Sequence, residues 1–280
     1  MNKFSDKCEA FVKKKNSCLI LGLDPNLAKM PKHLPQKAEG VFTFCSEIIN
    51  ATEKMIAGVK IQMAYFEILG SEGIAVVERL LKLCREKELL TIVDGKRNDI
   101  GSTAEAYAEA YLGKGPLEAD ALTVNPFLGS DGILPFVKKC EENGKGIFVL
   151  VRTSNPSAVE FQAGDKEISV RVAEKIGEWD ITTQSETNFL SGVGAVIGAT
   201  LDPKLIEFFR EEMPHAWFLC PGIGAQGGDL ANVLAVRKNG IGVLVPMSRS
   251  ILYAGDGKDF AQKSVEAMME IYEEQRTISN

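Results

Sequence analysis

The sequence predicts a single-domain α/β fold, a (β/α)8 barrel of the TIM type with an extra N-terminal helix. Eight short, continuously apolar runs occur along the chain, and a segment with helical periodicity follows each of them. The length of 280 residues suits one barrel, because such barrels typically take about 250 residues. No linker or low-complexity segment interrupts the chain, which predicts one domain over residues 1–280. The alternative is an open doubly wound sheet, but the fingerprint G-x-G-x-x-G does not follow the first strand.

The predicted strands are runs of about five apolar residues, too short for helices and bounded by turn residues or charges. Their continuous apolarity is typical of parallel strands that are covered on both faces. The second run is unusual because it contains a lysine, Lys60. The expected strands cover residues 18–23, 58–62, 89–93, 119–124, 146–151, 193–199, 216–220 and 242–246.

The predicted helices are recognised by apolar residues at helical spacing and by their start signals. In residues 71–87, for example, Ile74 and Val77 begin an apolar stripe. Asp202 followed by Pro203 is typical of an N-cap with proline at the first helical position. The expected helices cover residues 5–15, 40–55, 71–87, 131–143, 167–179, 230–238 and 258–275, with further helices starting near residues 102 and 202.

The region 156–190 is the least regular part of the sequence. Residues 156–166 are predicted to be a long polar loop, and residues 182–188 are also polar. The region is compatible with a lid, a dimer arm or a crossing helix.

The composition predicts a cytoplasmic protein. A net charge of −6 and a pI of about 5.2 argue against a general nucleic-acid or membrane-surface binder. The six cysteines form no C-x-x-C pair, which is typical of buried thiols in a reducing compartment. The N-terminus lacks the apolar core of a signal peptide, and no apolar run approaches the ~18 residues of a membrane span. The only histidines, His33 and His215, have no partner at zinc-ligand spacing, so no metal site is expected.

The strongest candidate for chemistry is the end of the third strand, because barrel enzymes place reactive groups at the carboxyl ends of strands. Asp94, Lys96 and Asp99 follow its apolar run, and alternation along a strand puts the first two on one face. Lys60 needs a carboxylate partner if it points inward. These residues predict a network of two lysines and two aspartates. A lysine held between carboxylates stays charged, so it can donate a proton or stabilise a carbanion. The alternative is an ion-pair network that only closes the barrel.

The ends of the seventh and eighth strands predict a phosphate site. Residues 221–228 are rich in glycine, which lets backbone N–H groups approach an anion. Residues 248–251 contain Arg249, which can bind a phosphate with two parallel hydrogen bonds. Each loop alone would be read as a tight turn, but phosphate sites of barrels frequently lie after these two strands.

At these residues the sequence resembles the orotidine 5′-phosphate decarboxylase family, in particular its longer bacterial subgroup, type 2. The resemblance covers essentially the whole chain, and its motifs occur in the family's order. They are the D-x-K-R-x-D-I motif at residues 94–100, followed by Thr103, and residues 22–25, 59–60, 221–228 and 248–251.

The resemblance implies a (β/α)8 barrel that works as a homodimer without metal or organic cofactor. The family converts orotidine 5′-phosphate to uridine 5′-phosphate and carbon dioxide in pyrimidine (UMP) biosynthesis. Lys96 would protonate C6 of the pyrimidine, and Asp94 would lie near the substrate carboxylate. Asp99 would reach into the active site of the partner subunit. Ile100 and Thr103 would cross the dimer interface.

The resemblance also implies the residues that bind the substrate. Asp24 and Lys60 would bind ribose hydroxyls, and Ser154 would contact the pyrimidine. Gln226 and Arg249, with nearby backbone amides, would hold the phosphate. The remaining expected substrate contacts are Asn125, Pro221, Gly222, Gly227 and Ser248.

Two other functions compete with this interpretation. Magnesium-dependent 3-keto-sugar-phosphate decarboxylases and hexulose-phosphate synthases share the D-x-K-x-x-D pattern, but they carry an acidic residue in the second strand. This chain has Lys60 there, and a cation would repel the metal. The other alternative is a non-catalytic barrel that binds a sugar phosphate, but binding alone does not require two lysines between two aspartates.

Overall fold

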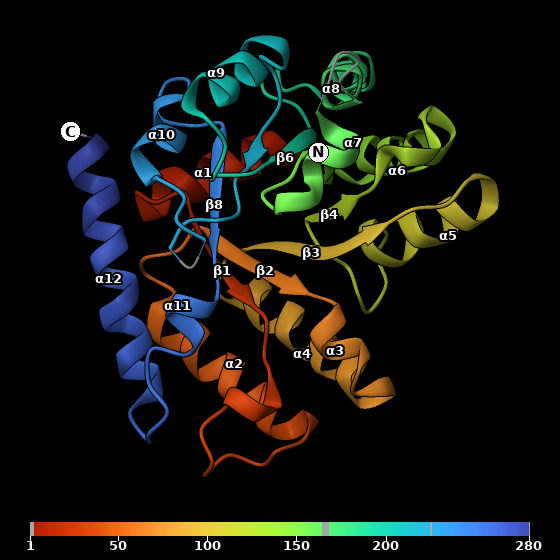
Figure 1. The fold of residues 1–280 in the computed structure, drawn as a ribbon. Coiled ribbons are helices and arrows are strands. Elements are labelled where there is room, and N and C mark those ends of the chain that lie inside the picture. The colour runs from red at the N-terminus through yellow and green to blue at the C-terminus, as the bar shows by residue number, and fades with distance from the viewer. Residues whose placement is uncertain (1–2, 164–167, 225, 280) are drawn as a thin grey trace.

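A computed structural model describes residues 3–163, 168–224 and 226–279 and shows a closed barrel of eight parallel strands (Figure 1). The strands follow one another around the barrel in chain order, and the eighth pairs with the first. This closure confirms the predicted (β/α)8 barrel and excludes the open sheet. The strands are β1 (Leu19–Leu23), β2 (Gly58–Gln62), β3 (Leu90–Arg97), β4 (Ala121–Val124), β5 (Gly146–Arg152), β6 (Val193–Ile197), β7 (Phe218–Leu219) and β8 (Val243–Met247).

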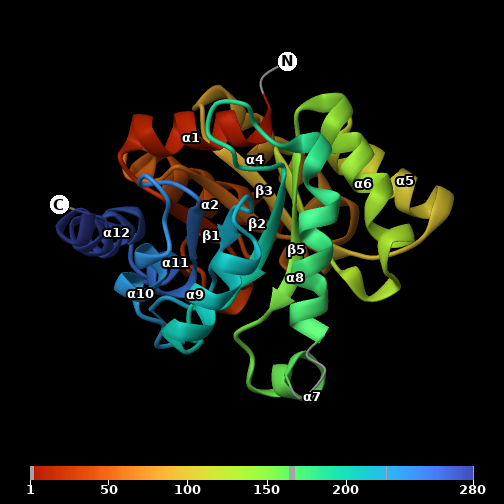
Figure 2. The same ribbon diagram turned by 90° about the horizontal axis from the view of Figure 1, so that it is seen from above.

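Helices surround the strands (Figure 2). Those of the outer layer are α2 (Ala38–Thr52), α4 (Gly70–Glu86), α5 (Gly101–Leu112), α6 (Ser130–Asn143), α8 (Ile168–Trp179), α9 (Pro203–Glu212), α10 (Leu230–Ala235) and α12 (Phe260–Ser279). Short helical turns that the sequence analysis did not predict are α3 (Ala64–Glu67) and α11 (Arg249–Leu252), together with the 3-10 turns η1 (Leu27–Lys29), η2 (Pro126–Leu128) and η4 (Ile181–Thr183). Among the described residues, no helix combines the length and apolarity that crossing a membrane would need.

The largest local differences from prediction occur in β3 and after β5. Strand β3 extends to Arg97, so Asp94 and Lys96 belong to the strand itself, whereas Asp99 follows it. The predicted polar loop 156–166 contains η3 (Pro156–Ala158) and α7 (Val159–Gln162). Its last turn folds back onto the strand because the Gln162 Oε1 atom accepts a 2.8 Å hydrogen bond from the Thr153 N–H group. The end of that loop and the first residue of the predicted helix 167–179 lie outside the described residues.

The side chains of each strand alternate between two apolar cores. In β3, Val93 faces the surrounding helices, whereas Leu90 and Ile92 fill the barrel interior. The same alternation in β2 sends Val59 and Ile61 outward. The even-numbered residues of both strands therefore form one inward face, and its polar members lie at the carboxyl ends.

The extra N-terminal helix, α1 (Phe4–Lys15), covers the opposite end of the barrel. Its apolar residues Phe4, Cys8 and Val12 join the interior core. The ring of Phe4 meets the ring of Phe148 edge-on, with 6.0 Å between centroids. In Figure 2, α1 lies across the barrel from α7, which follows the carboxyl end of β5. The helix thus closes the amino-terminal end of the barrel.

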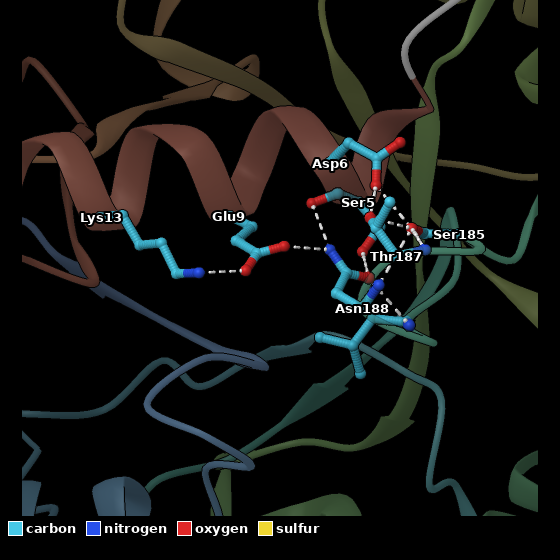
Figure 3. Close-up of polar contacts among 8 residues, drawn as sticks. Ser5, Asp6, Glu9, Lys13, Ser185, Thr187 and Asn188 are labelled. Carbon is cyan, nitrogen blue, oxygen red and sulfur yellow. Dashed lines mark hydrogen bonds and ion pairs between the residues drawn. The ribbon is translucent and has the colours of Figure 1, made fainter.

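A polar network joins α1 to the segment before β6, which belongs to the irregular region 156–190 (Figure 3). The Asn188 side chain donates to Glu9 (2.7 Å) and accepts from the Ser5 hydroxyl (2.9 Å). The Ser5 hydroxyl oxygen also accepts a 2.8 Å hydrogen bond from the buried indole N–H of Trp217. Ser5 therefore links the helix, the segment and the start of β7.

Replacing Ser5 with alanine is expected to destabilise the fold. The substitution leaves the buried indole N–H of Trp217 without its acceptor, and a lost buried partner costs about 1–3 kcal/mol. Thermal unfolding should show a midpoint several degrees lower, since ~1 kcal/mol shifts a chain of this size by a few degrees. Ser46→Ala is the matched control, because within the described part of the chain the Ser46 hydroxyl bonds only to the Thr43 carbonyl of its own helix. Equal midpoints for the two variants would contradict the linking role of Ser5.

Candidate active site

The inward faces of β2 and β3 place the charged residues together. Lys60 and Gln62 continue the inward face of β2, and Asp94 pairs with Gln62 in the register between the two strands. A cavity of about 470 Å³ opens beside them at the carboxyl ends of the strands. It is lined by seven predicted site residues, Asp24, Lys60, Pro221, Gly222, Gln226, Ser248 and Arg249, and by Gln62, Ala64, Tyr65, Ile223, Pro246 and Ser250.

The carboxylate of Asp94 is the centre of a buried hydrogen-bond network. Its Oδ2 atom accepts from Lys60 Nζ at 2.7 Å and from Gln62 Nε2 at 3.0 Å. Its Oδ1 atom accepts from Lys96 Nζ at 2.6 Å and from the Thr123 hydroxyl at 2.9 Å. Three neighbouring strands therefore supply the donors, and the predicted contacts of Asp94 with both lysines are present.

The two lysines hold Asp94 in its charged form. Burial would raise the pKa of Asp94, but the charges of Lys60 and Lys96 outweigh it and bring the pKa well below its usual value. Burial would likewise lower the pKa of Lys60, yet the charges of Asp94 and Asp24 leave it above the usual value. Both buried groups are therefore ionised at neutral pH.

The loops after β7 and β8 form the other side of the cavity. Gly222 has a φ of +119°, a conformation that favours glycine. Gly227 lies further along this loop, also with a positive φ of +78°, and Gln226 beside it lines the cavity. After β8, which pairs with β1, Ser248 and Arg249 line the cavity. The glycine-containing loop after β7 and Arg249 after β8 thus line the same cavity, and the phosphate site expected there remains a prediction.

Two polar atoms on the cavity-lining residues have no hydrogen-bond partner among the described residues. They are the Oδ1 atom of Asp24 and the hydroxyl of Ser248, and both are buried. The turn that carries Asp24 is held by Tyr253, whose hydroxyl donates to the Asp24 carbonyl and accepts from the Asn26 N–H, both at 2.7 Å. Unpaired buried acceptors and donors are costly, so these atoms are suited to bind the polar groups of a ligand.

The remaining predicted residues do not line this cavity. Asp99, Ile100 and Thr103 lie at the start of α5, where Ile100 is exposed and the Asp99 carboxylate bonds to the next backbone N–H. Asn125 lines a second cavity with Phe127 and caps the turn η2. Ser154 follows β5, and its backbone lies against Gly198. The roles of these five residues, like those of the residues that line the cavity, remain predictions.

Gln62 and Thr123 are two members of the network that are not among the residues predicted from the sequence. A periodicity signal was present, because Gln62 lies two residues after Lys60 and therefore on the same strand face. Thr123 lies on the inward face of β4, two residues after Ala121, which fills the interior. Among the residues that the structure describes, no cluster of three or more His, Cys, Asp or Glu side chains is arranged to hold a metal ion.

A closed parallel barrel with a charged cavity at the carboxyl ends of its strands defines the class of (β/α)8-barrel enzymes. Within that class, residues 17–263 match the family model described as "Orotidine 5'-phosphate decarboxylase / HUMPS family". The chain belongs to this family.

Curated relatives and solved structures agree with this assignment. The orotidine 5′-phosphate decarboxylase of Caldicellulosiruptor bescii is 42% identical over 278 residues, covering 91% of this chain and 90% of the relative. The protein of that name from Rhodopirellula baltica is 40% identical and covers 93% and 92%. Putative orotidine monophosphate decarboxylases from Streptomyces avermitilis and Toxoplasma gondii superpose with TM-scores of 0.85 and 0.84 at 32% and 33% identity. They cover 99% of this chain and 96% and 98% of theirs.

Replacing Asp94 with asparagine is expected to destabilise the protein in a pH-dependent way. Buried Lys60 would lose its counter-charge, which costs about 3 kcal/mol at pH 7. In the folded wild type the pKa of Asp94 is below its unfolded value of about 4, so its contribution is present above that pH and is lost as the pH falls below it. The difference in free energy of unfolding between wild type and Asp94→Asn should therefore shrink between pH 7 and pH 3, as measured by denaturant unfolding.

Glu39→Gln is the control for this experiment. Glu39 forms an exposed ion pair with Arg79, so its loss should have little effect at either pH. A difference between wild type and Asp94→Asn that is the same at both pH values would show that Asp94 is not held ionised by the lysines.

Proposed function

We propose that this protein decarboxylates orotidine 5′-phosphate to uridine 5′-phosphate and carbon dioxide in pyrimidine biosynthesis. The observation that carries the proposal is the Lys60–Asp94–Lys96 network beside the cavity, in a chain about 40% identical to proteins of that name. A magnesium-dependent sugar-phosphate enzyme is less compatible with this cavity. Such enzymes carry an acidic residue in the second strand, where this chain has Lys60. A site that only binds a sugar phosphate has no need of a buried carboxylate between two lysines.

Lys96 is the proposed proton donor. When the bond between C6 and the carboxylate carbon breaks, the electron pair remains on C6, where the pyrimidine offers no electron sink. A fixed ammonium next to this carbon stabilises the developing negative charge and then delivers its proton to C6. Asp94 holds the ammonium of Lys96 at 2.6 Å, and we place Asp94 near the substrate carboxylate.

The rest of the cavity is proposed to bind the ribose and the phosphate. The unpaired Asp24 Oδ1 atom and the ammonium of Lys60 suit the ribose hydroxyls. Gln226 and Arg249 suit the phosphate, and Pro221, Gly222, Gly227 and Ser248 complete its contacts. The phosphate would lie far from C6, so its binding energy can be used to order the substrate for reaction. We assign Ser154 and Asn125 to the pyrimidine side, because they follow β5 and β4 at the same end of the barrel.

We further propose a homodimer with shared active sites. Asp99, Ile100 and Thr103 would contact the partner subunit, with Asp99 completing the partner's charged network. In support, Ile100 and Leu134 are about half exposed and line one groove between α5 and α6, which lie side by side in Figures 1 and 2. An exposed groove with large apolar side chains is typical of a protein interface.

The proposed setting is the cytoplasm, and the proposed chemistry needs no metal or organic cofactor. All six cysteines are free and buried, which suits a reducing compartment. The ammonium of Lys96 supplies the proton. Lys60 occupies the position in the second strand at which magnesium-dependent enzymes with the D-x-K-x-x-D pattern carry an acidic residue.

Purified protein should consume orotidine 5′-phosphate in the presence of EDTA, and Lys96→Ala should lower kcat/KM by at least 100-fold, about 2.7 kcal/mol of transition-state stabilisation. The loss follows because, among the described residues, Lys96 supplies the only ammonium that contacts Asp94 Oδ1. The decrease in substrate absorbance measures both. Lys14→Ala, which removes an exposed lysine of α1, is the matched control and should keep wild-type activity.

Two results would contradict these proposals separately. Wild-type protein without turnover in EDTA would reject the decarboxylase function. A loss of less than tenfold in Lys96→Ala would reject Lys96 as the proton donor.

Subunit mixing tests the shared site. Asp99→Ala and Lys96→Ala proteins should each be inactive, but a mixture should regain activity because one site of each hybrid dimer has all four charged residues. The activity of the mixture is measured after subunit exchange has been demonstrated with labelled chains. No recovery despite exchange would mean that Asp99 acts within its own chain.

A further inference from the structure

We propose that Thr123 of β4 is a positioning residue that fixes both Asp94 and Lys96 in reactive geometry through one hydroxyl group. The inference deepens the proposed decarboxylase function and rests on it. Thr123 is 1% exposed and does not line the cavity. It would therefore act through the two charged residues and not by touching the substrate.

The backbone of β3 is irregular where it carries the reactive residues. Strand β4 pairs regularly with β3 up to Val93 and again at Arg97, but the register shifts between these two positions. Residues 94–96 of β3 therefore lie opposite a single residue of β4, Thr123, and form a bulge. Within the bulge Lys96 has a φ of +46°, in the left-handed region that residues with a side chain rarely adopt. Such a conformation persists only if its surroundings hold it.

The Thr123 hydroxyl makes the contacts that hold this bulge. It donates to the Asp94 Oδ1 atom at 2.9 Å and accepts from the Lys96 backbone N–H at 2.9 Å. The directions follow from the chemistry, because an ionised carboxylate can only accept and a backbone N–H can only donate. A single hydroxyl thus replaces the missing ladder bond and orients the carboxylate at the same time.

The position of the Lys96 ammonium depends on these contacts because packing does not fix it. The Lys96 side chain is 45% exposed, whereas that of Asp94 is 8% exposed. The two ends of the lysine are its backbone, bonded to Thr123, and its Nζ atom, bonded to Asp94. The Thr123 hydroxyl therefore fixes the lysine backbone directly and the lysine Nζ atom through Asp94. A displacement of about 1 Å at a reacting group can cost on the order of 100-fold in rate.

Thr123→Val tests the inference, because valine keeps the branched shape and removes the hydroxyl. We expect kcat for orotidine 5′-phosphate to fall 30- to 100-fold, on the order of the loss that a ~1 Å displacement causes. KM should stay within about threefold, because the phosphate and ribose contacts are untouched. Thr123→Ser, which keeps the hydroxyl, should stay within about fivefold of wild-type kcat, a loss of about 1 kcal/mol in transition-state stabilisation. If the valine variant does not fold, Thr123→Ala carries the same test.

Thr91→Val is the matched control within the same pair of strands. The Thr91 hydroxyl of β3 bonds to Asp120 just before β4 at 2.8 Å, and Thr91 is as buried as Thr123. Its contact joins the two strands at the far end of the barrel. Thr91→Val should lower the unfolding temperature and leave kcat unchanged, so it separates a general loss of strand pairing from the loss of positioning.

Three kinetic results would overturn the inference: a Thr123→Val kcat within threefold of wild type, a serine variant no better than the valine variant, or an equal loss of kcat in Thr91→Val. Wild-type protein without turnover would reject the decarboxylase function instead. Crystal structures of the wild type and of Thr123→Val test the geometry independently of activity. Thr123→Val should move Lys96 out of the left-handed region and its Nζ atom away from Asp94, and an unchanged bulge would refute the positioning role.

Discussion

The ionised carboxylate of Asp94 is the group on which the structure of the site depends. Four donors from three adjacent strands surround its two oxygens. A buried charge is tolerated only when it is paired and hydrogen-bonded, so the register of β2, β3 and β4 cannot change without a large cost. A one-residue shift would turn Lys60 and Gln62 outward among the apolar side chains that face the helices. The site and the barrel closure therefore depend on each other.

The sequence predicts the barrel well because burial leaves a strong pattern. Apolar runs such as 58–62 are short and are each followed by a helical segment, and the lysine within that run needs a buried counter-charge, which indicates Asp94. The pattern is weaker where short polar elements occur. The turn Val159–Gln162 is held by a contact of Gln162 with the end of β5, a tertiary contact without any local signal. Because this turn depends on a tertiary contact, the sequence of residues 159–162 predicts a loop.

The finer geometry of the site could not be predicted from the sequence. The left-handed backbone of Lys96 has no local signature, because glycine is the residue usually found there and the next residue, Arg97, resumes the strand. Thr123 was missed because a threonine in an apolar run is ordinary in a strand. Asp99 could be placed only by analogy, since within the described chain it meets neither lysine of the network.

The contacts of α1 have a consequence for how the chain folds as it is synthesised. Helix α1 precedes all of the barrel strands in the chain, yet its Ser5 bonds to Trp217 across 212 positions of sequence. Among the other polar partners of α1, Ser185, Thr187 and Asn188 also come late in the chain, whereas Asp120 comes earlier. Until they emerge, Phe4 and Cys8 have no completed barrel interior to enter, and contacts between such distant segments form slowly. The apolar face of α1 can therefore be covered completely only after residues far downstream of it, as far as Trp217, have been made.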